Sequence, residues 1–161
     1  MYNLSFIKFE KSDFPDYYQL VSNEQVMAQI TERAIPLEEA KADYEKLLKR
    51  NKLHDLFGSF RIMDAGNYIG LGHLTRNEEN EEEAEIGYMI LPAFWGKRYG
   101  TEIAKKLVNK AEQTSVRKLT AIIDPANAAS KKILTKLDFV TEKICKIDGL
   151  PGEILGKKLG E

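Results

Sequence analysis

The sequence has little cysteine and histidine, and it lacks a long apolar run. Cys145 is the only cysteine, which excludes an internal disulfide, and we expect it to serve in packing. His54 and His73 are far apart and lack metal-ligand spacing, so we expect no metal. No stretch approaches the ~20 apolar residues that span a bilayer. The start, MYNLSFIKFEKSDF, has no basic segment before an apolar run, so we expect a cytoplasmic protein with no membrane partner.

The sequence also lacks an excess of charge of either sign. Its 24 basic and 25 acidic residues give a formal net charge of −1. This balance argues against a nucleic-acid partner, because such binding depends largely on contacts with phosphates. A chain of 161 residues, 43% of them hydrophobic, fits one globular domain over residues 1–161.

Alternating and helical apolar patterns follow one another along the chain. Their order predicts an α/β (α+β) fold, in which a mixed, mostly antiparallel sheet of about seven strands carries helices on both faces. The segments DAGN and DGLPG predict hairpin turns. The acidic segment NEENEEE is either a solvated loop or a feature that attracts a cationic substrate. The expected strands are 4–10, 56–63, 68–76, 83–91, 117–124, 139–147 and 152–159; the expected helices are 12–23, 36–51, about 97–111 and 127–137.

The segment PAFWGKRYGTE lies between an expected strand and an expected helix. A helix that begins at about Lys97 leaves its first N–H groups unpaired and carries a partial positive charge there, which favours an anion. Gly96 and Gly100 permit close approach to the backbone, and Lys97 and Arg98 add charge. The alternative is an ordinary strand-to-helix turn. The G-x-G-x-x-G and G-x-x-x-x-G-K-[ST] phosphate motifs are absent.

A longer stretch resembles a known family. The segment EIGYMILPAFWGKRYGTEIAKKLVNKA, followed after a short strand by NAASKKILTKLDF, resembles the acetyl-CoA core of the GNAT superfamily of N-acetyltransferases. The resemblance covers residues 85–139 and is closest to the branch of ribosomal-protein alanine N-acetyltransferases. It implies a single-domain GNAT fold in which two parallel strands, ending near Leu91 and Asp124, splay apart to form the cofactor cleft.

The resemblance also implies roles for individual residues toward acetyl-CoA. Backbone groups would hold the pantetheine arm, and a row of N–H groups would hold the pyrophosphate. The helix expected at residues 127–137 would make the remaining contacts with the cofactor. Asn127 would bond the cofactor and Ser130 would lie near its sulfur. Independently of the resemblance, the residue type of Asn127 and its place at the start of the expected helix 127–137 predict that it caps this helix. The backbone groups are those of Met89, Ile90 and Leu91, and the N–H groups are those of Gly96, Lys97, Arg98, Tyr99, Gly100 and Thr101.

Four positions depart from the pattern of the wider superfamily. Trp95 takes the first place of the loop, as the alanine-transferase branch often allows, and Arg98 replaces the first glycine. Asp138 replaces the glycine before Phe139, and Asp tolerates a left-handed turn better than most residues. Leu134 stands where many members place a Tyr that protonates the departing thiolate.

Acetyl transfer to an amine needs a neutral nucleophile, a polarised carbonyl and a tolerated thiolate. Glu85 is the preferred base, because alternation places it on the same strand face as Gly87, Met89 and Leu91 at the edge of the expected cleft; otherwise it is a surface residue that ends the acidic run. His73 is the second candidate, or else a packed strand residue. Ser130 either bonds the sulfur or caps its helix, and an N–H near Ile90 could bond the oxyanion.

Roughly a tenth of an α-amine of pKa ~8 is neutral at pH 7, against roughly one part in 2,500 of a lysine-like amine. A weak base therefore fits an α-amine acceptor.

We therefore expect an acetyl-CoA-dependent N-acetyltransferase that acts on a small-molecule or peptide amine in a ternary complex, without a metal. The alternatives are a catalytically silent acyl-CoA-binding or sensor domain and an oligomerisation scaffold. Tyr88, Phe94 and Trp95 line the acceptor site or belong to the core. Residues 23–36 and the last hairpin would form the variable acceptor surface, and a monomer or homodimer is expected.

Overall fold

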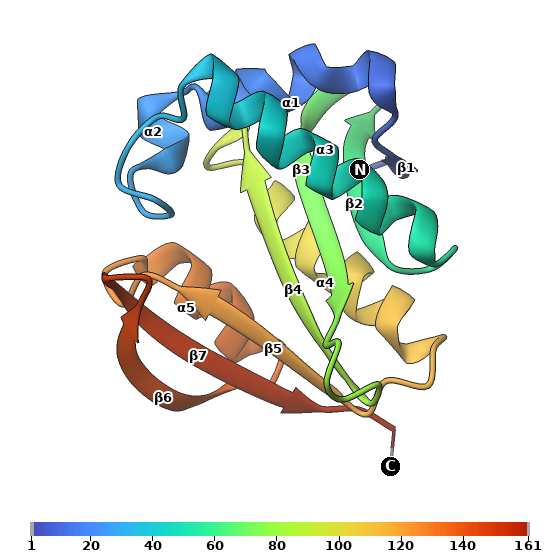
Figure 1. The fold of residues 1–161 in the computed structure, drawn as a ribbon. Coiled ribbons are helices and arrows are strands. Elements are labelled where there is room, and N and C mark those ends of the chain that lie inside the picture. Colours follow the sequence, from blue (N-terminus) through green and yellow to red (C-terminus); the bar gives the residue numbers. More distant parts are fainter. Residues whose placement is uncertain (1, 161) are drawn as a thin grey trace.

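The computed structural model describes residues 2–160, and its elements follow the expected order (Figure 1). Three short elements are additional: a helix, α2, and two 3-10 turns, η1 and η2. The strands are β1 (Leu4–Lys8), β2 (Gly58–Asp64), β3 (Asn67–Arg76), β4 (Glu83–Ile90), β5 (Lys118–Ile123), β6 (Val140–Ile147) and β7 (Leu150–Lys158). The helical elements are η1 (Lys11–Asp13), α1 (Phe14–Val21), α2 (Glu24–Met27), α3 (Leu37–Leu53), η2 (Pro92–Phe94), α4 (Tyr99–Glu112) and α5 (Ala128–Lys136).

The seven strands form one sheet in the order β1-β2-β3-β4-β5-β7-β6. Every neighbouring pair is antiparallel except β4 and β5, so the expected fold class is confirmed. The parallel pair is short: its register runs from Glu83 opposite Lys118 to Glu85 opposite Thr120. Beyond these residues the two strands diverge, as Figure 1 shows, and the expected splay is present.

Helices cover both faces of the sheet, and each face has its own apolar core. On one face, Ile103 and Leu107 of α4 and Leu134 of α5 pack with Ile86 of β4. On the other, the helices α1 to α3 pack against β3 and the end of β4, for example through Leu20, Tyr44 and Leu71. The alternation of side chains along β4 therefore separates the two cores.

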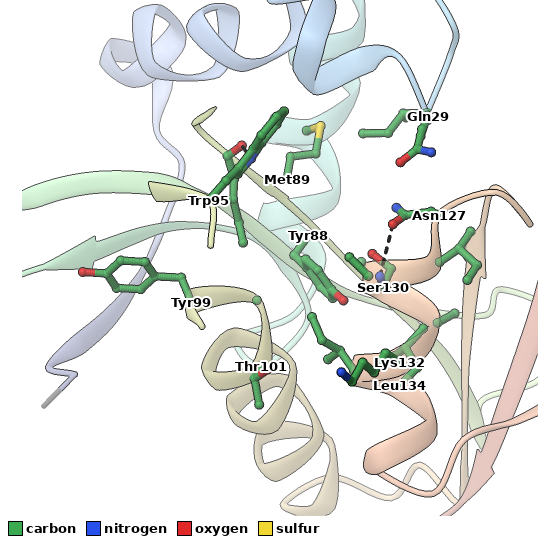
Figure 2. A pocket seen from close by; sticks show the side chains of 18 of the residues that line it. Gln29, Tyr88, Met89, Trp95, Tyr99, Thr101, Asn127, Ser130, Lys132 and Leu134 are labelled. Atoms are coloured by element: carbon green, nitrogen blue, oxygen red, sulfur yellow. Dashed lines mark hydrogen bonds between the residues drawn. The ribbon is translucent and has the colours of Figure 1, made fainter. Parts of the chain in front are cut away.

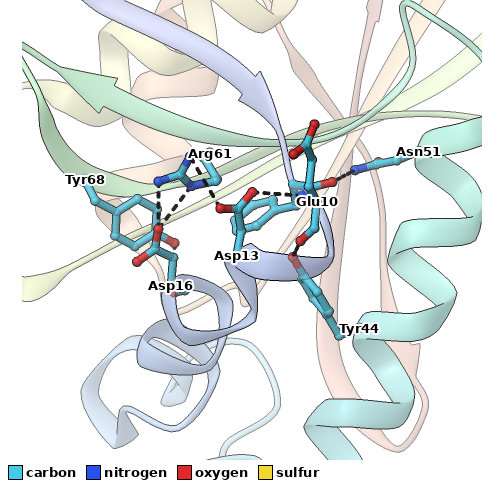
Figure 3. Close-up of polar contacts among 8 residues, drawn as sticks. Glu10, Asp13, Asp16, Tyr44, Asn51, Arg61 and Tyr68 are labelled. Atoms are coloured by element: carbon cyan, nitrogen blue, oxygen red, sulfur yellow. Dashed lines mark hydrogen bonds and ion pairs between the residues drawn. The ribbon is translucent and has the colours of Figure 1, made fainter.

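Polar contacts fix α1 to the sheet at the end where the strands diverge (Figure 3). The Arg61 guanidinium of β2 donates to the Asp16 carboxylate at 2.9 and 3.0 Å, and Asp13 lies 3.7 Å away. The Tyr68 hydroxyl donates to the Asp16 carbonyl at 3.0 Å, and the Tyr44 hydroxyl donates to the Glu10 carbonyl. These partly buried contacts set the position of α1 and of α2, which follows it.

Both expected hairpin turns are present. Of the residues in DAGN whose type suits a positive φ angle, Asp64, Gly66 and Asn67, only Gly66 has one (φ 85°), and the other belongs to Ala65 (φ 50°). In the second hairpin Asp148 and Gly149 form the turn, so β7 begins at Leu150, two residues before the expected start. No helix within residues 2–160 has the length and apolar character needed to cross a bilayer.

Candidate active site

The cleft between β4 and β5 begins at the amino end of α4. This helix starts at Tyr99, two residues after the expected start, because Arg98 has a left-handed backbone (φ 67°) that a right-handed helix cannot include. Asp138, the other non-glycine residue at an expected glycine position, is also left-handed (φ 71°). Arg98 and Asp138 therefore both have a backbone conformation that glycine adopts more easily than a residue with a side chain.

A row of free N–H groups precedes α4. Within the described part of the chain, no N–H group of residues 96–101 donates a hydrogen bond, and the first such bond of this helix runs from Glu102 to the Arg98 carbonyl. Six consecutive donors at a helix amino end form a site for an anion. Gly96 has φ 74° and open space around it, whereas a Cβ at Gly100 would lie 3.0 Å from Ile133 Cδ1. Gly96 is thus needed for the turn and Gly100 for the contact between α4 and α5.

A cavity of about 560 Å³ connects these N–H groups with the diverging strands (Figure 2). Its wall contains most of the residues that the sequence predicted for the cofactor: Met89, Ile90, Gly96, Arg98, Tyr99, Gly100, Thr101, Asn127 and Ser130. Leu91 and Lys97 are not in the wall. The Leu91 side chain is buried in the core, and its N–H donates to the Ile69 carbonyl at 2.9 Å. The Lys97 ammonium lies 6.0 Å from the centre of the Phe94 ring.

Backbone groups of Ile90 face the cleft. The Leu91 N–H points to β3, and neighbouring residues of a strand point their N–H and C=O groups to opposite sides. The Ile90 groups are therefore directed away from β3, where β4 no longer pairs with β5. The Trp95 indole N–H donates to the Ile90 carbonyl at 2.7 Å, and 48% of Trp95 is exposed.

The amino end of α5 forms the opposite wall. Asn127 caps this helix, as expected, because its Oδ1 accepts from the Ser130 N–H at 3.1 Å. Within residues 2–160 the Ser130 hydroxyl makes no capping bond, so it remains available to the cavity. Leu134 is 1% exposed and offers no hydroxyl. Tyr88 and Phe94 line the cavity and also pack against the core, so the interpretation of these rings as core residues is confirmed.

Part of the wall comes from the expected variable segment. Gln25, Val26, Gln29 and Ile30 line the cavity from α2 and the turn that follows, and Figure 2 shows Gln29 opposite Asn127. We did not predict α2 or these individual residues. Asn23 was the available signal, because its side chain caps α2 by accepting from the N–H groups of Gln25 and Val26.

The two candidate bases lie side by side beyond Gly87. His73 Nε2 is 3.9 Å from Glu85 Oε2, and His73 Nδ1 is 3.0 Å from the Thr75 hydroxyl. A Cβ at position 87 would lie 2.3 Å from His73 Nε2, so the glycine makes room for the imidazole. Burial, and then the charge of Arg50, lowers the pKa of His73 to about 4. Burial raises the pKa of Glu85. Glu85 and His73 are not in the cavity wall, but Gly87 between them is.

Known proteins share this architecture. Residues 3–140 match the family model of the acetyltransferase (GNAT) domain. The chain belongs to this family. A GNAT-family acetyltransferase from Bacillus anthracis has a TM-score of 0.80 at 19% identity, with 98% of each chain covered. Spermidine N-acetyltransferase from Vibrio cholerae, in complex with CoA and spermine, has a TM-score of 0.80 at 19% identity, with 96% of this chain and 95% of that one covered. These similarities show a shared GNAT fold.

One relative found by sequence matches a shorter part of the chain than the family model does. The uncharacterized protein YkkB of Bacillus subtilis is 32% identical over 74 residues, which are 45% of this chain and 43% of YkkB. The chain therefore matches less than half the length of that relative.

The site has the chemistry that coenzyme A requires. The N–H row and Arg98 suit a diphosphate, and the Ile90 N–H, which is directed away from β3, suits an amide-containing arm, whereas the Ile90 carbonyl already accepts from Trp95. Within residues 2–160 no group of three or more His, Cys, Asp or Glu side chains could hold a metal ion.

Proposed function

We propose that residues 1–161 form one domain, an acetyl-CoA-dependent N-acetyltransferase that acetylates a primary amine by direct attack in a ternary complex. One observation carries this proposal: in a GNAT chain, a single cavity is lined both by five of the six residues with free N–H groups at the start of α4 and by the cleft between β4 and β5. The same site can bind a diphosphate and bring an acyl group to the opposite side of the sheet.

Different residues of the cavity would bind different parts of acetyl-CoA. The N–H groups of residues 96–101 and the Arg98 guanidinium would hold the pyrophosphate. The Ile90 backbone groups and the Met89 side chain would hold the pantetheine arm, and the Asn127 amide N–H groups would add a bond, since its oxygen already accepts from Ser130. When bound, acetyl-CoA supplies an activated acyl group.

Glu85 is the proposed base. Its pKa is raised by burial, which makes its carboxylate a better proton acceptor than an ordinary glutamate. His73 stays uncharged at neutral pH, and therefore does not stabilise the Glu85 carboxylate as a cation would. The Ile90 N–H, directed into the cleft, would stabilise the oxyanion.

The acceptor is either a peptide α-amine or a small-molecule amine. A single carboxylate base is sufficient for an α-amine, because roughly a tenth of it is neutral at pH 7. The resemblance around Trp95 to the ribosomal-protein alanine N-acetyltransferases supports the same class. The structurally similar spermidine enzyme holds spermine, which makes polyamines the second class to test.

A catalytically silent acyl-CoA sensor is the alternative that two observations favour. Leu134 provides no acid, and Arg98 occupies a strained left-handed position in the phosphate loop. Both functions require cofactor binding, but only the enzyme releases free thiol when an amine is present.

Calorimetry would test the binding step. We expect acetyl-CoA to bind at micromolar concentration, 3′-dephospho-acetyl-CoA to report any contribution of that phosphate, and ATP not to bind. Arg98→Gln tests the contribution of the guanidinium to this binding. Lys105→Gln is its matched control, because Lys105 lies on α4 outside the cavity wall. Thiol release is then followed with peptides that carry free N-termini, with amino acids and with polyamines. Binding without release would favour the sensor, and no binding would contradict both functions.

A further inference from the structure

The cavity has two halves, one on each face of the sheet. Ile86 and Tyr88 of β4 line it from the face that α4 and α5 cover. Val26 and Met89 line it from the face that α1 to α3 cover. Side chains alternate along β4, so Glu85 points to the same face as Met89. An amine that gives its proton to Glu85 must therefore approach from this second face.

The half of the cavity on this second face, called the acceptor half below, exposes apolar side chains. Ile122 belongs to it because Leu119 and Ala121 of β5 pack in the core beside α4 and α5, and alternation points Ile122 to the other face. Ile30 is 44% exposed and Ile122 is 42% exposed. The acceptor half is lined by Gln25, Val26, Gln29, Ile30, Met89 and Ile122.

The cavity offers nothing to a second positive charge. Within the part of the chain that the structure describes, no carboxylate lines it, and the two charged side chains in its wall, Arg98 and Lys132, are cationic. Glu24 and Glu32 flank the wall residues of α2 and of the turn after it, but both are exposed and lie outside the wall. A second ammonium group on the acceptor would enter an uncharged site without a partner, which is unfavourable. The charges of the wall therefore disfavour polycations such as polyamines.

We propose that the acceptor is a primary monoamine with an apolar substituent and no second positive charge, and that Ile30 and Ile122 determine this specificity. The inference rests on the proposed acetyl transfer. The two isoleucines would contact the apolar substituent, and the uncharged amides of Gln25 and Gln29 would bond a polar group of the acceptor. Apolar surroundings also disfavour the ammonium form, so they increase the fraction of neutral amine that can attack.

A matched pair of acceptors tests this selectivity. Norleucinamide and lysinamide share an α-amine and a carboxamide, but the side chain of the first ends in a methyl group and that of the second in an ammonium group. We expect kcat/KM for norleucinamide to exceed the values for lysinamide and for spermidine by about 100-fold. Equal or higher values for lysinamide or spermidine would overturn the proposal.

A carboxylate placed in the acceptor half should weaken the preference. In Ile30→Glu and in Ile122→Glu, the ratio of kcat/KM for norleucinamide to that for lysinamide should fall at least about tenfold, because the new charge pairs with the second ammonium group. Ile7→Glu is the matched control and should keep the wild-type ratio, since Ile7 is 49% exposed on the edge strand β1 and lies outside the wall. A wild-type ratio in both test variants would overturn the role of the two isoleucines.

Binding separates this inference from the proposed function. Calorimetry on the protein saturated with CoA measures the affinity for an acceptor without acetyl transfer. Norleucinamide should bind roughly tenfold more tightly than lysinamide. This preference in a protein that releases no thiol from acetyl-CoA would support the acceptor site and overturn the proposed transfer. Thiol release without the preference would overturn the inference and leave the transfer in place.

Discussion

His73 Nε2 lies 3.9 Å from Glu85 Oε2 across the pair of strands β3 and β4. The pair is not an ordinary ion pair, since burial lowers the pKa of the imidazole to about 4 and raises the pKa of the carboxyl. Both groups therefore favour their neutral forms more than they would in water. A neutral histidine beside a carboxylate of increased basicity is an arrangement suited to accepting a proton from an amine.

Glu85→Gln should slow acetyl transfer and change its pH dependence. The wild-type kcat/KM is expected to fall as the pH drops through a pKa above that of an ordinary glutamate, because protonated Glu85 cannot accept a proton. The variant should lose about 100-fold in kcat/KM above that pKa, with unchanged affinity for acetyl-CoA. Glu83→Gln, two residues earlier on the strand, is the control. A wild-type pH profile in Glu85→Gln would exclude Glu85 as the base.

His73 should make the stability of the protein depend on pH. The unfolded chain binds a proton at this residue near pH 6.5 and the folded chain only near pH 4, so the contribution is present above pH 6.5 and is lost as the pH falls toward 4. The pKa difference of about 2.5 units, at about 1.4 kcal/mol per unit, gives an upper limit of about 3 to 4 kcal/mol for the loss.

Urea denaturation at pH 7.5 and pH 4.5 measures this effect by comparing the wild-type residue with His73→Gln. Glu85 acts in the opposite direction because its pKa is raised, so both proteins should carry Glu85→Gln. The free energy of unfolding should depend less on pH when His73 is replaced. Equal pH dependence with and without His73 would contradict the low pKa.

Arg98→Gly should separate backbone strain from charge. Glycine adopts φ 67° without the penalty that a side chain brings, so the free energy of unfolding should rise by about 1 kcal/mol. Affinity for acetyl-CoA should fall roughly tenfold because a guanidinium in the cavity wall is lost. Arg98→Ala is the matched control: it loses the charge and keeps the strain, so it should lose affinity without the gain in stability. Equal stability of the two variants would contradict the assignment of strain.

Trp95 should report cofactor binding through its fluorescence. It is the only tryptophan of the chain, it is half-exposed, and its N–H donates to the Ile90 carbonyl in the cavity. A pantetheine arm at Ile90 would compete for that carbonyl and change the surroundings of the indole. The emission should therefore change with acetyl-CoA and give the same Kd as calorimetry. Calorimetric binding without any change in emission would place the cofactor away from Ile90.

Much of the architecture was predictable because its causes are local. Alternation along β4 placed Glu85, Gly87 and Met89 on one face, and the structure confirms this placement. The Asn127 cap was predicted from residue type and position. The start of α4 was not, because Arg98 has a left-handed backbone (φ 67°) that glycine adopts far more easily than arginine, so the residue type did not indicate the break.

The acidic loop illustrates the same limit. Its charge alone left open whether it attracts a cationic substrate. Figure 1 shows the segment between β3 and β4 at the end of the sheet opposite the divergence of β4 and β5, which favours the solvated loop.

The sequence by itself determined the order of the elements, the faces of the strands and the run of unpaired N–H groups at the start of α4. These follow from periodicity, turn chemistry and the unpaired N–H groups of a helix end, all of which act over a few neighbouring residues. Only the tertiary structure decided that His73 meets Glu85, that Gln29 faces Asn127, and that Ile30 and Ile122 line the same cavity. Such relationships depend on how separate elements pack together, and no local pattern encodes the distance between them.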